Sequence, residues 1–175
     1  MAVCRSYVIP LLLGVISFPV FADIPPLYID VARQQGVPPN VLYSLALTES
    51  KKRLDNGKLR PWPWTLNVKG KPYFYTTRTE ACRALNRFLT TTRIVDIGLT
   101  QQNWRYQGDH FSSPCAVFDP VDNLTHAARL LREGYRVHGS WVGAAGWFHR
   151  PAGGRLAEKY KAHFVSNYRT VRYEG

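Results

Sequence analysis

The sequence predicts one α+β domain that is mainly helical and contains one small β-hairpin. The chain has 175 residues, of which 45% are hydrophobic and 13% aromatic, which suits a single domain with its own core and argues against disorder. Apolar residues recur at helical spacing in most segments. Aromatic and β-branched residues instead flank Lys69-Gly70, a pattern typical of two strands joined by a turn.

The N-terminal segment, residues 1–22, predicts a signal peptide. Arg5 is its only charged residue, an apolar run follows, and Val20-Phe21-Ala22 resembles a signal-peptidase cleavage site. We therefore expect cleavage after Ala22, which leaves residues 23–175 as one periplasmic domain. The apolar run is short and contains two prolines, so an uncleaved anchor is the weaker alternative, and no later segment is apolar enough to span a membrane.

Prolines and a glycine delimit the first two expected helices. Pro25-Pro26 opens a helix that continues to about Gln35, and Gly36 can end it in a left-handed conformation. Pro38-Pro39 opens a second helix in the same way, and this one ends near Ser50.

A loop, the hairpin and four further helices are expected after Ser50. Residues 51–61 are polar and basic and contain Asn56-Gly57, which predicts a loop. The two hairpin strands are expected at residues 64–68 and 72–75, the only strand pattern in the chain. The later helices are expected to begin at Thr77 with a capping box, at Asp119, at Ser140 and at about Arg155.

Glu49 is the first candidate for a functional residue. It continues the apolar stripe of its helix, at i+7 from Leu42 and i+4 from Leu45, so its carboxyl group is expected to face inward. Desolvation would raise the pKa of this carboxyl and keep it protonated, as a general acid requires. The alternative is an ordinary Glu in a fraying last turn, kept ionised by residues 51–53. Helical phase alone favours that alternative.

The cysteines predict one disulfide. Cys4 leaves with the signal peptide, so Cys82 and Cys115 are the remaining pair in a chain expected to reach an oxidising compartment. Two buried thiols or a metal pair are weaker alternatives, because no Cys-x-x-Cys motif or close His accompanies either cysteine. No metal site is expected.

The charge predicts an acidic partner. Removal of residues 1–22 takes away only Arg5, so the net charge falls from +11 to +10. The bacterial wall, its anionic polymers, membrane surfaces and nucleic acid all fit such a charge. Nucleic acid ranks low, because the chain has no zinc finger, no basic stripe confined to one helix and no other nucleic-acid-binding signature.

Four short patterns occur in a fixed order along the chain. They are Leu47-Thr48-Glu49-Ser50, Val95 to Gln102 around Gly98-Leu99-Thr100-Gln101, the helix from Asn123 to Leu131, and Ala144 to His149. Together they resemble the family 1 lytic transglycosylases, and the resemblance covers residues 29–168. The nearest likeness is to the small transglycosylases of conjugation and type IV secretion systems and of integrating elements, in which a hairpin like Trp62 to Asn67 lies between the two motifs.

This resemblance implies a lysozyme-like fold whose cleft binds the glycan strands of peptidoglycan. It implies that Glu49 is the single catalytic acid/base and that the Ser50 hydroxyl helps to orient the site. It also implies a substrate-binding turn formed by Gly98, Leu99, Thr100 and Gln101. Thr100 replaces the usual Met of this turn, so an apolar contact with the sugar is expected to differ.

Phe148 and His149 are the remaining residues that the resemblance implies for substrate binding. They depart further from the family pattern, which has Tyr-Asn at this place. The Tyr hydroxyl normally reaches toward the catalytic carboxyl, and Phe148 has none. His149 could replace the hydrogen bond, or Tyr160 or Tyr168 could supply a hydroxyl; the sequence leaves these alternatives open.

The expected reaction needs one carboxyl group and neither a metal nor an organic cofactor. Ordinary glycosidases use two carboxylates, and only Asp55 and Asp96 are candidates for a second one here, each also explained as a loop or capping residue. A lytic transglycosylase that opens the wall for a conjugation or secretion apparatus is therefore the leading hypothesis. A catalytically impaired wall-binding scaffold and a lysozyme-type muramidase are the alternatives.

Overall fold

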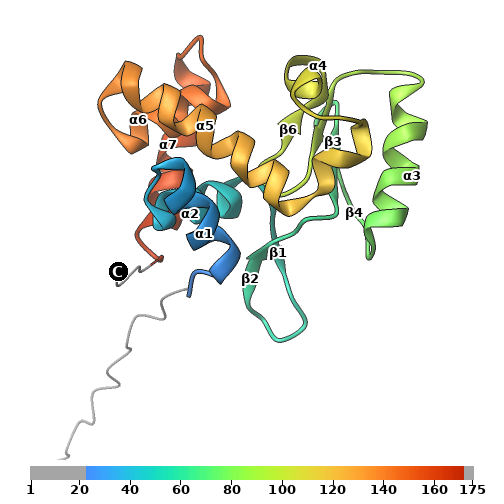
Figure 1. Cartoon of the computed structure of the whole chain (residues 1–175), viewed down its shortest axis with the longest axis horizontal. Coiled ribbons are helices and arrows are strands. Elements are labelled where there is room, and N and C mark those ends of the chain that lie inside the picture. Colours follow the sequence, from blue (N-terminus) through green and yellow to red (C-terminus); the bar gives the residue numbers. More distant parts are fainter. Residues whose placement is uncertain (1–22, 172–175) are drawn as a thin grey trace, which may run out of the picture.

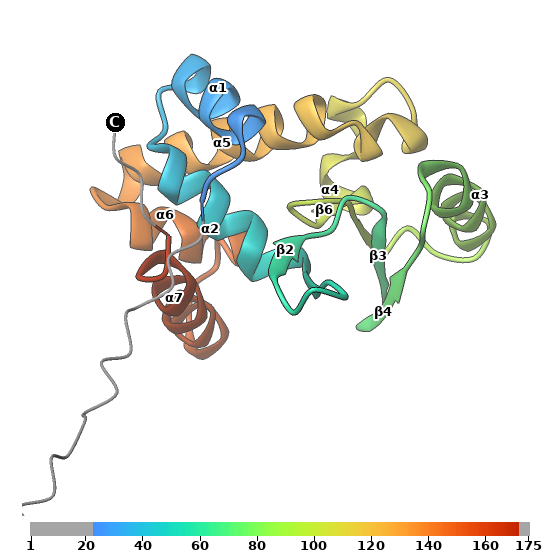
Figure 2. The same ribbon diagram turned by 90° about the horizontal axis from the view of Figure 1, so that it is seen from below.

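The computed structural model describes residues 23–171, and the expected signal peptide lies outside this range. The fold is α+β and mainly helical, and it has two lobes with separate hydrophobic clusters. Helices α1, α2, α6 and α7 gather in one lobe, whereas β3 to β6 and α3 form the other (Figure 1). Helix α5 spans both lobes, as the view from below shows (Figure 2).

The helical lobe is built around α2, which is buried on nearly all sides. Its members are α1 (Pro26–Gln35), α2 (Pro39–Ser50), α5 (Pro120–His138), α6 (Trp141–His149) and α7 (Arg155–Tyr168). Every residue from Val41 to Leu47 is buried, and Leu124 and Leu131 of α5 and Phe164 of α7 complete the cluster. This packing fixes the end of α2, which carries Glu49, between the two lobes.

The expected helix ends are confirmed. Gly36 adopts a left-handed conformation with φ of 67° after α1. The side chains of Asp119 and Ser140 accept hydrogen bonds from backbone amides in the first turns of α5 and α6. Thr77 and Glu80 form both hydrogen bonds of a capping box at the start of α3 (Arg78–Leu89).

The sheet lobe contains four antiparallel strands in the order β4-β3-β5-β6. These are β3 (Thr65–Val68), β4 (Lys71–Phe74), β5 (Val95–Ile97) and β6 (Gln102–Asn103). Their apolar side chains pack against Ala81, Ala84 and Leu85 of α3. The predicted Cys82–Cys115 disulfide is confirmed, with a Cα–Cα distance of 5.3 Å, and it ties α3 to the 3₁₀ helix Pro114–Phe118.

The prediction of a single hairpin is wrong. Residues 51–61, expected as a loop, form a second hairpin from β1 (Lys51–Arg53) and β2 (Leu59–Pro61). Strand β5 pairs with β3 about thirty residues earlier in the chain, and β6 pairs with β5. These strands have two or three residues, too few to show an alternating pattern, and their partners are selected by tertiary packing. A short helix α4 (Trp104–Gln107) and a 3₁₀ turn (Gly108–His110) were also not expected.

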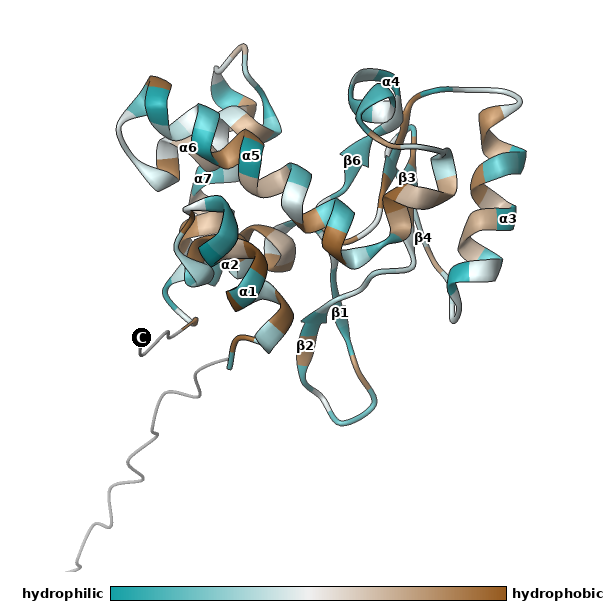
Figure 3. Cartoon of the chain, in the orientation of Figure 1, coloured by the Kyte–Doolittle hydropathy of each residue, from teal (hydrophilic) through white to brown (hydrophobic). Residues whose placement is uncertain are grey.

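Hydrophobic and hydrophilic residues are interspersed along α3 and α5, a pattern typical of helices with one buried face (Figure 3). Within residues 23–171, no helix combines the length and the apolar character needed to cross a membrane.

Candidate active site

A cavity of about 710 Å³ lies where α2, α6 and the sheet lobe meet. Glu49, Phe148 and His149 line it from the helical lobe. The sheet lobe contributes a set of polar side chains, which includes Asn67, Asp96, Gln101, Gln102, Asn103 and Gln107. The cavity therefore combines two carboxyl groups, those of Glu49 and Asp96, with many amide groups that can donate and accept hydrogen bonds.

The Glu49 carboxyl group has the environment of a general acid. Desolvation by the surrounding protein raises its pKa from 4.5 to about 8, and the charge of Asp96 acts in the same direction. The Lys51-to-Arg53 run does not keep it ionised: Lys51 and Arg53 line a different pocket, and Lys51 bonds to Asn167. At neutral pH, Glu49 is thus mostly protonated and able to donate a proton into the cavity.

Tyr160 of α7 is the hydroxyl partner of Glu49. Its hydroxyl donates a hydrogen bond to Glu49 Oε1 at 2.5 Å, which lowers the pKa of Glu49 against the larger effect of burial. The His149 ring stacks on the Tyr160 ring with 4.2 Å between centroids and 5° between planes. Tyr168 instead accepts a hydrogen bond from Asn40. Of the three replacements considered for the missing Phe148 hydroxyl, the structure therefore places Tyr160 on the carboxyl group and His149 behind Tyr160.

Ser50 connects α2 to the Gly98–Gln101 turn. Its buried hydroxyl donates to the Leu99 carbonyl oxygen at 2.6 Å, across 49 residues of sequence. This bond holds the turn against the end of α2, next to Glu49. Ser50 therefore acts on the site by positioning the turn, since its own side chain does not line the cavity.

The turn itself is held by Asn123, a buried residue of α5. Gly98 has φ of 79°, and a Cβ atom there would lie 2.8 Å from Asn123 Nδ2, so only glycine fits. Asn123 Oδ1 accepts hydrogen bonds from the Thr100 backbone amide at 3.0 Å and from its hydroxyl at 2.6 Å. Thr100 is completely buried, so it does not face the cavity. Its departure from the family pattern changes the support of the turn, with no direct contact available to a sugar.

The predicted site residues thus divide into two groups. Glu49, Gln101, Phe148 and His149 line the cavity. The buried members Ser50, Gly98, Leu99 and Thr100 lie behind it and support its wall. Gln101 holds the unusual φ of 48°, and its side-chain amide donates to the Gly98 carbonyl oxygen at 3.0 Å.

A second carboxyl group, that of Asp96, lines the same cavity. Asn103 donates a hydrogen bond to Asp96 Oδ1 at 2.7 Å, and burial raises the pKa of Asp96 while this bond lowers it. Asp55, the other candidate, is exposed in the loop between β1 and β2 and does not line the cavity. The structure therefore brings one of the two possible second carboxylates near Glu49.

Several cavity residues were not expected from the sequence. They are Asn67, Gln102, Asn103, Tyr106, Gln107, Leu130 and the segment Arg150 to Ala152. The amide-rich run Gln101-Gln102-Asn103 was a signal that could have indicated part of this set. Within residues 23–171, no three His, Cys, Asp or Glu side chains come together as a metal site.

Comparisons with known protein families, with curated proteins and with solved structures found no match to this chain.

Proposed function

We propose that the chain is an exported lytic transglycosylase with a lysozyme-like fold, which cleaves the β-1,4 bond between N-acetylmuramic acid and N-acetylglucosamine in peptidoglycan. The observation that carries the proposal is the Glu49 carboxyl group, which has a pKa of about 8 and is bonded to Tyr160 in a cavity between two lobes. The four motifs that resemble the family 1 lytic transglycosylases converge there: Ser50 and Asn123 bind the turn, and Phe148 and His149 line the same cavity.

In the first step, the protonated Glu49 donates its proton to the glycosidic oxygen as the bond from that oxygen to C1 of the muramic acid breaks. The N-acetylglucosamine side leaves as an alcohol, and positive charge develops at C1. Glu49 becomes a carboxylate, which Tyr160 stabilises by its hydrogen bond. Tyr160 thus favours the charged form of Glu49 at the moment when that form appears.

In the second step, the Glu49 carboxylate removes the proton from the C6 hydroxyl of the same muramic acid. The C6 oxygen attacks C1 and closes a 1,6-anhydro ring, and the proton taken from the C6 hydroxyl returns Glu49 to its acid form, while the proton donated first stays on the leaving group. The substrate supplies its own nucleophile, so one acid/base group completes the cycle. No water is consumed in this reaction.

The other lining residues provide the groups that a glycan needs. Gln101, Asn103 and Gln107 carry amides that can bond sugar hydroxyl and N-acetyl groups. Tyr106, 72% exposed at the edge of the cavity, offers a ring face on which a sugar can stack. We further propose that the enzyme opens local gaps in the wall for a conjugation or secretion apparatus, consistent with its signal-peptide pattern, disulfide and basic charge.

The test is digestion of purified sacculi followed by mass spectrometry of the soluble products. Muropeptides ending in 1,6-anhydro-N-acetylmuramic acid are expected from the wild type and not from Glu49→Gln. Binding of sacculi without release of any product would instead indicate the scaffold alternative. The Tyr160 hydroxyl argues against that alternative, because it occupies the position on Glu49 that Phe148 leaves without a hydroxyl.

Asp96 favours a muramidase as the second candidate function. Its carboxyl group lines the cavity with Glu49 and influences the pKa of Glu49, so it could activate a water molecule for hydrolysis. A hydrolase would release products with a reducing muramic acid, heavier by one water than the anhydro products. Asp96→Asn should abolish such hydrolysis, whereas a transglycosylase should retain more of its activity in this variant.

A further inference from the structure

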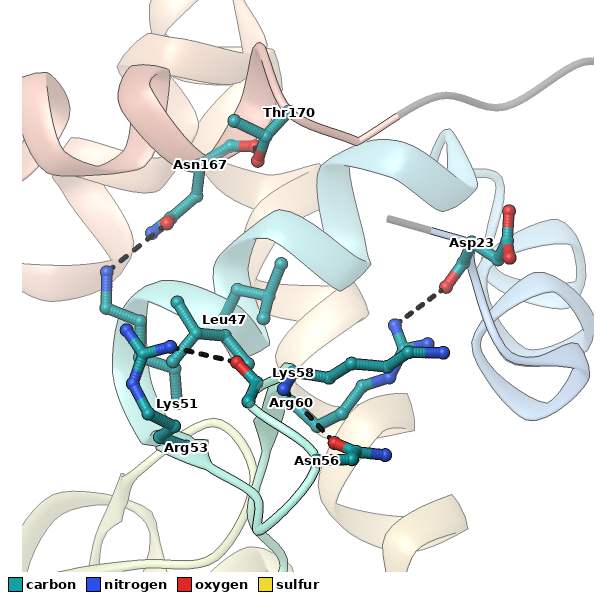
Figure 4. A pocket seen from close by; sticks show the side chains of 11 residues that line it. Asp23, Leu47, Lys51, Arg53, Asn56, Lys58, Arg60, Asn167 and Thr170 are labelled. Atoms are coloured by element: carbon teal, nitrogen blue, oxygen red, sulfur yellow. Dashed lines mark hydrogen bonds between the residues drawn. The ribbon is translucent and has the colours of Figure 1, made fainter. Parts of the chain in front are cut away.

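A second pocket lies on the other side of α2 from Glu49. Its volume is about 690 Å³, and it shares no lining residue with the candidate active site. Leu47 of α2 lines it, and two residues along an α-helix correspond to about 200° of rotation, so Glu49 points the other way. Four basic side chains line this pocket, namely Lys51, Arg53, Lys58 and Arg60. We call it the basic pocket (Figure 4).

The four cations of the basic pocket have no carboxylate bonded to them within residues 23–171. The ion pair between Lys161 and Glu158 lies in the first half of α7, and neither residue lines this pocket. Asp23 is the single acidic residue of the lining, and Arg60 bonds to its main-chain oxygen at 3.2 Å. The concentrated positive charge therefore favours an anionic ligand.

Hydrogen bonds to uncharged acceptors hold the guanidinium groups of Arg53 and Arg60 in place. Arg60 also donates to the Tyr43 hydroxyl at 2.8 Å, and Arg53 donates to the Gly57 carbonyl oxygen at 2.9 Å. In Figure 4, Lys51 and Arg53 lie on one side of Leu47, and Lys58 and Arg60 on the other. All three of these bonds use the Nη1 atom of the arginine concerned, so both guanidinium groups retain N–H donors for a carboxylate.

The rest of the lining suits a short peptide. Leu59, which is 41% exposed, provides an apolar surface, and Asn56, Asn167 and Thr170 provide amide and hydroxyl groups around it. A ligand with carboxylates, small methyl groups and peptide bonds would match all three kinds of surface. A recess of this kind also fits a discrete ligand better than the flat surface of a membrane.

Helix α7 connects the basic pocket to the candidate active site. Tyr160 bonds to Glu49, and Asn167, seven residues later and roughly 10 Å along the helix, lines the basic pocket. Asn167 bonds to Thr48 at 2.9 Å and accepts from Lys51 at 3.4 Å. The two pockets therefore lie at neighbouring positions along α7, on opposite sides of α2.

We propose that the basic pocket binds the carboxylate-bearing peptide stems that branch from the glycan strands of peptidoglycan. This inference rests on the proposed function, because it concerns the substrate of that site. It assigns the pocket a role in selecting glycan that still carries its peptides, with Arg53 and Lys58 as the exposed cations that contact the stem carboxylates.

The test measures binding in the Glu49→Gln background, which prevents turnover. Arg53→Gln/Lys58→Gln removes two charges from the pocket, and Lys71→Gln/Arg87→Gln removes two exposed charges from β4 and α3 as the matched control. The probes are glycan strands with intact stems, the same strands after amidase removal of the stems, the free tetrapeptide stem, and anionic phospholipid vesicles. Lys58→Glu is the second variant, because its side chain makes no hydrogen bond within residues 23–171 and its loss does not threaten the fold.

Affinity for stem-bearing glycan is expected to fall about tenfold in Arg53→Gln/Lys58→Gln and in Lys58→Glu, and by less than about twofold in the control. Affinity for stem-free glycan should not change. The free stem should shift the NMR signals of the Asn167 and Thr170 amides in the parent and not in these variants. Equal losses on both glycans, no loss on either, or loss confined to anionic phospholipid vesicles would each overturn the inference.

The outcomes also separate this inference from the proposed function. Stem-dependent binding by a wild type that releases no anhydro product would refute the transglycosylase and leave the stem site standing. Anhydro product released with no stem dependence of binding would refute the stem site alone.

Discussion

Removal of the Tyr160 hydroxyl should change the pH dependence of catalysis in a defined direction. Tyr160→Phe keeps the buried ring and its stacking with His149, and deletes only the donor to Glu49 Oε1. This hydrogen bond stabilises the carboxylate form and therefore lowers the pKa of Glu49. Its loss must raise that pKa.

The size of the effect follows from the strength of the bond. A hydrogen bond to a charged group contributes about 1.5 to 3 kcal/mol, and about 1.4 kcal/mol corresponds to one pKa unit. The pKa of Glu49, about 8 in the wild type, should thus rise by roughly one to two units. The carboxylate formed in the first step also loses its donor, so the maximal rate should fall about tenfold or more.

The assay is the pH profile of kcat/KM for release of anhydro-muropeptides from sacculi. Its alkaline limb reports the protonated fraction of the free enzyme's general acid. We expect this limb to move to higher pH in Tyr160→Phe. Tyr168→Phe is the matched control, because it removes a hydroxyl from the same helix that bonds to Asn40 instead of Glu49, and its profile should match the wild type.

An alkaline limb that stays in place, or that moves to lower pH, would contradict this prediction. Either result would mean that Tyr160 does not donate to the carboxylate during catalysis, or that Glu49 is not the group whose protonation limits the rate.

Three further predictions concern the same site and its supports. Glu49→Gln should abolish turnover. In denaturant titrations its free energy of unfolding should match that of the wild type near pH 4 and exceed it by up to about 4 to 5 kcal/mol at pH 9, because a pKa raised from 4.5 to about 8 costs the folded wild type stability as the pH rises through that window. Equal stability of the two proteins at pH 9 would contradict the burial of the Glu49 carboxyl group. Reduction of the disulfide between Cys82 and Cys115, two residues that are 33 positions apart, should lower the free energy of unfolding by about 3 to 4 kcal/mol on the chain-entropy model, and with it the melting temperature and the activity. Free thiols in protein purified from the periplasm would argue against a disulfide that forms in the cell. Gly98→Ala should lower the free energy of unfolding by about 1 to 3 kcal/mol and remove much of the activity, because φ is 79° and the Asn123 side-chain amide of α5 lies 2.8 Å from the new Cβ atom. Gly139→Ala, with φ of 65° and open space around it, is the control for backbone strain alone. An equal loss of stability in Gly139→Ala would show that the close contact at Gly98 is unimportant.

Helix positions could be predicted from the sequence because their signals are local. Pro25-Pro26, Asp119 and Ser140 satisfy or restrict the backbone of the next few residues, and the observed helices begin where these residues predict. The disulfide could also be predicted, since only two cysteines remain after the N-terminal segment. Helical phase placed Glu49 on the apolar stripe of its helix, but phase alone favoured an ordinary ionised Glu, and only the resemblance of its motif to the transglycosylases selected it as the catalytic acid.

The remaining features depend on contacts between segments far apart in the chain. Strand β5 has three residues and forms because β3 offers it a partner, and Thr100 faces Asn123 only because α5 passes behind the turn. The sequence showed that Phe148 lacks a hydroxyl and named three possible replacements. Only the tertiary structure selected Tyr160, which lies 111 residues from Glu49, because the packing of α7 against α2 decides which side chain reaches the carboxyl group, and no local pattern contains that information.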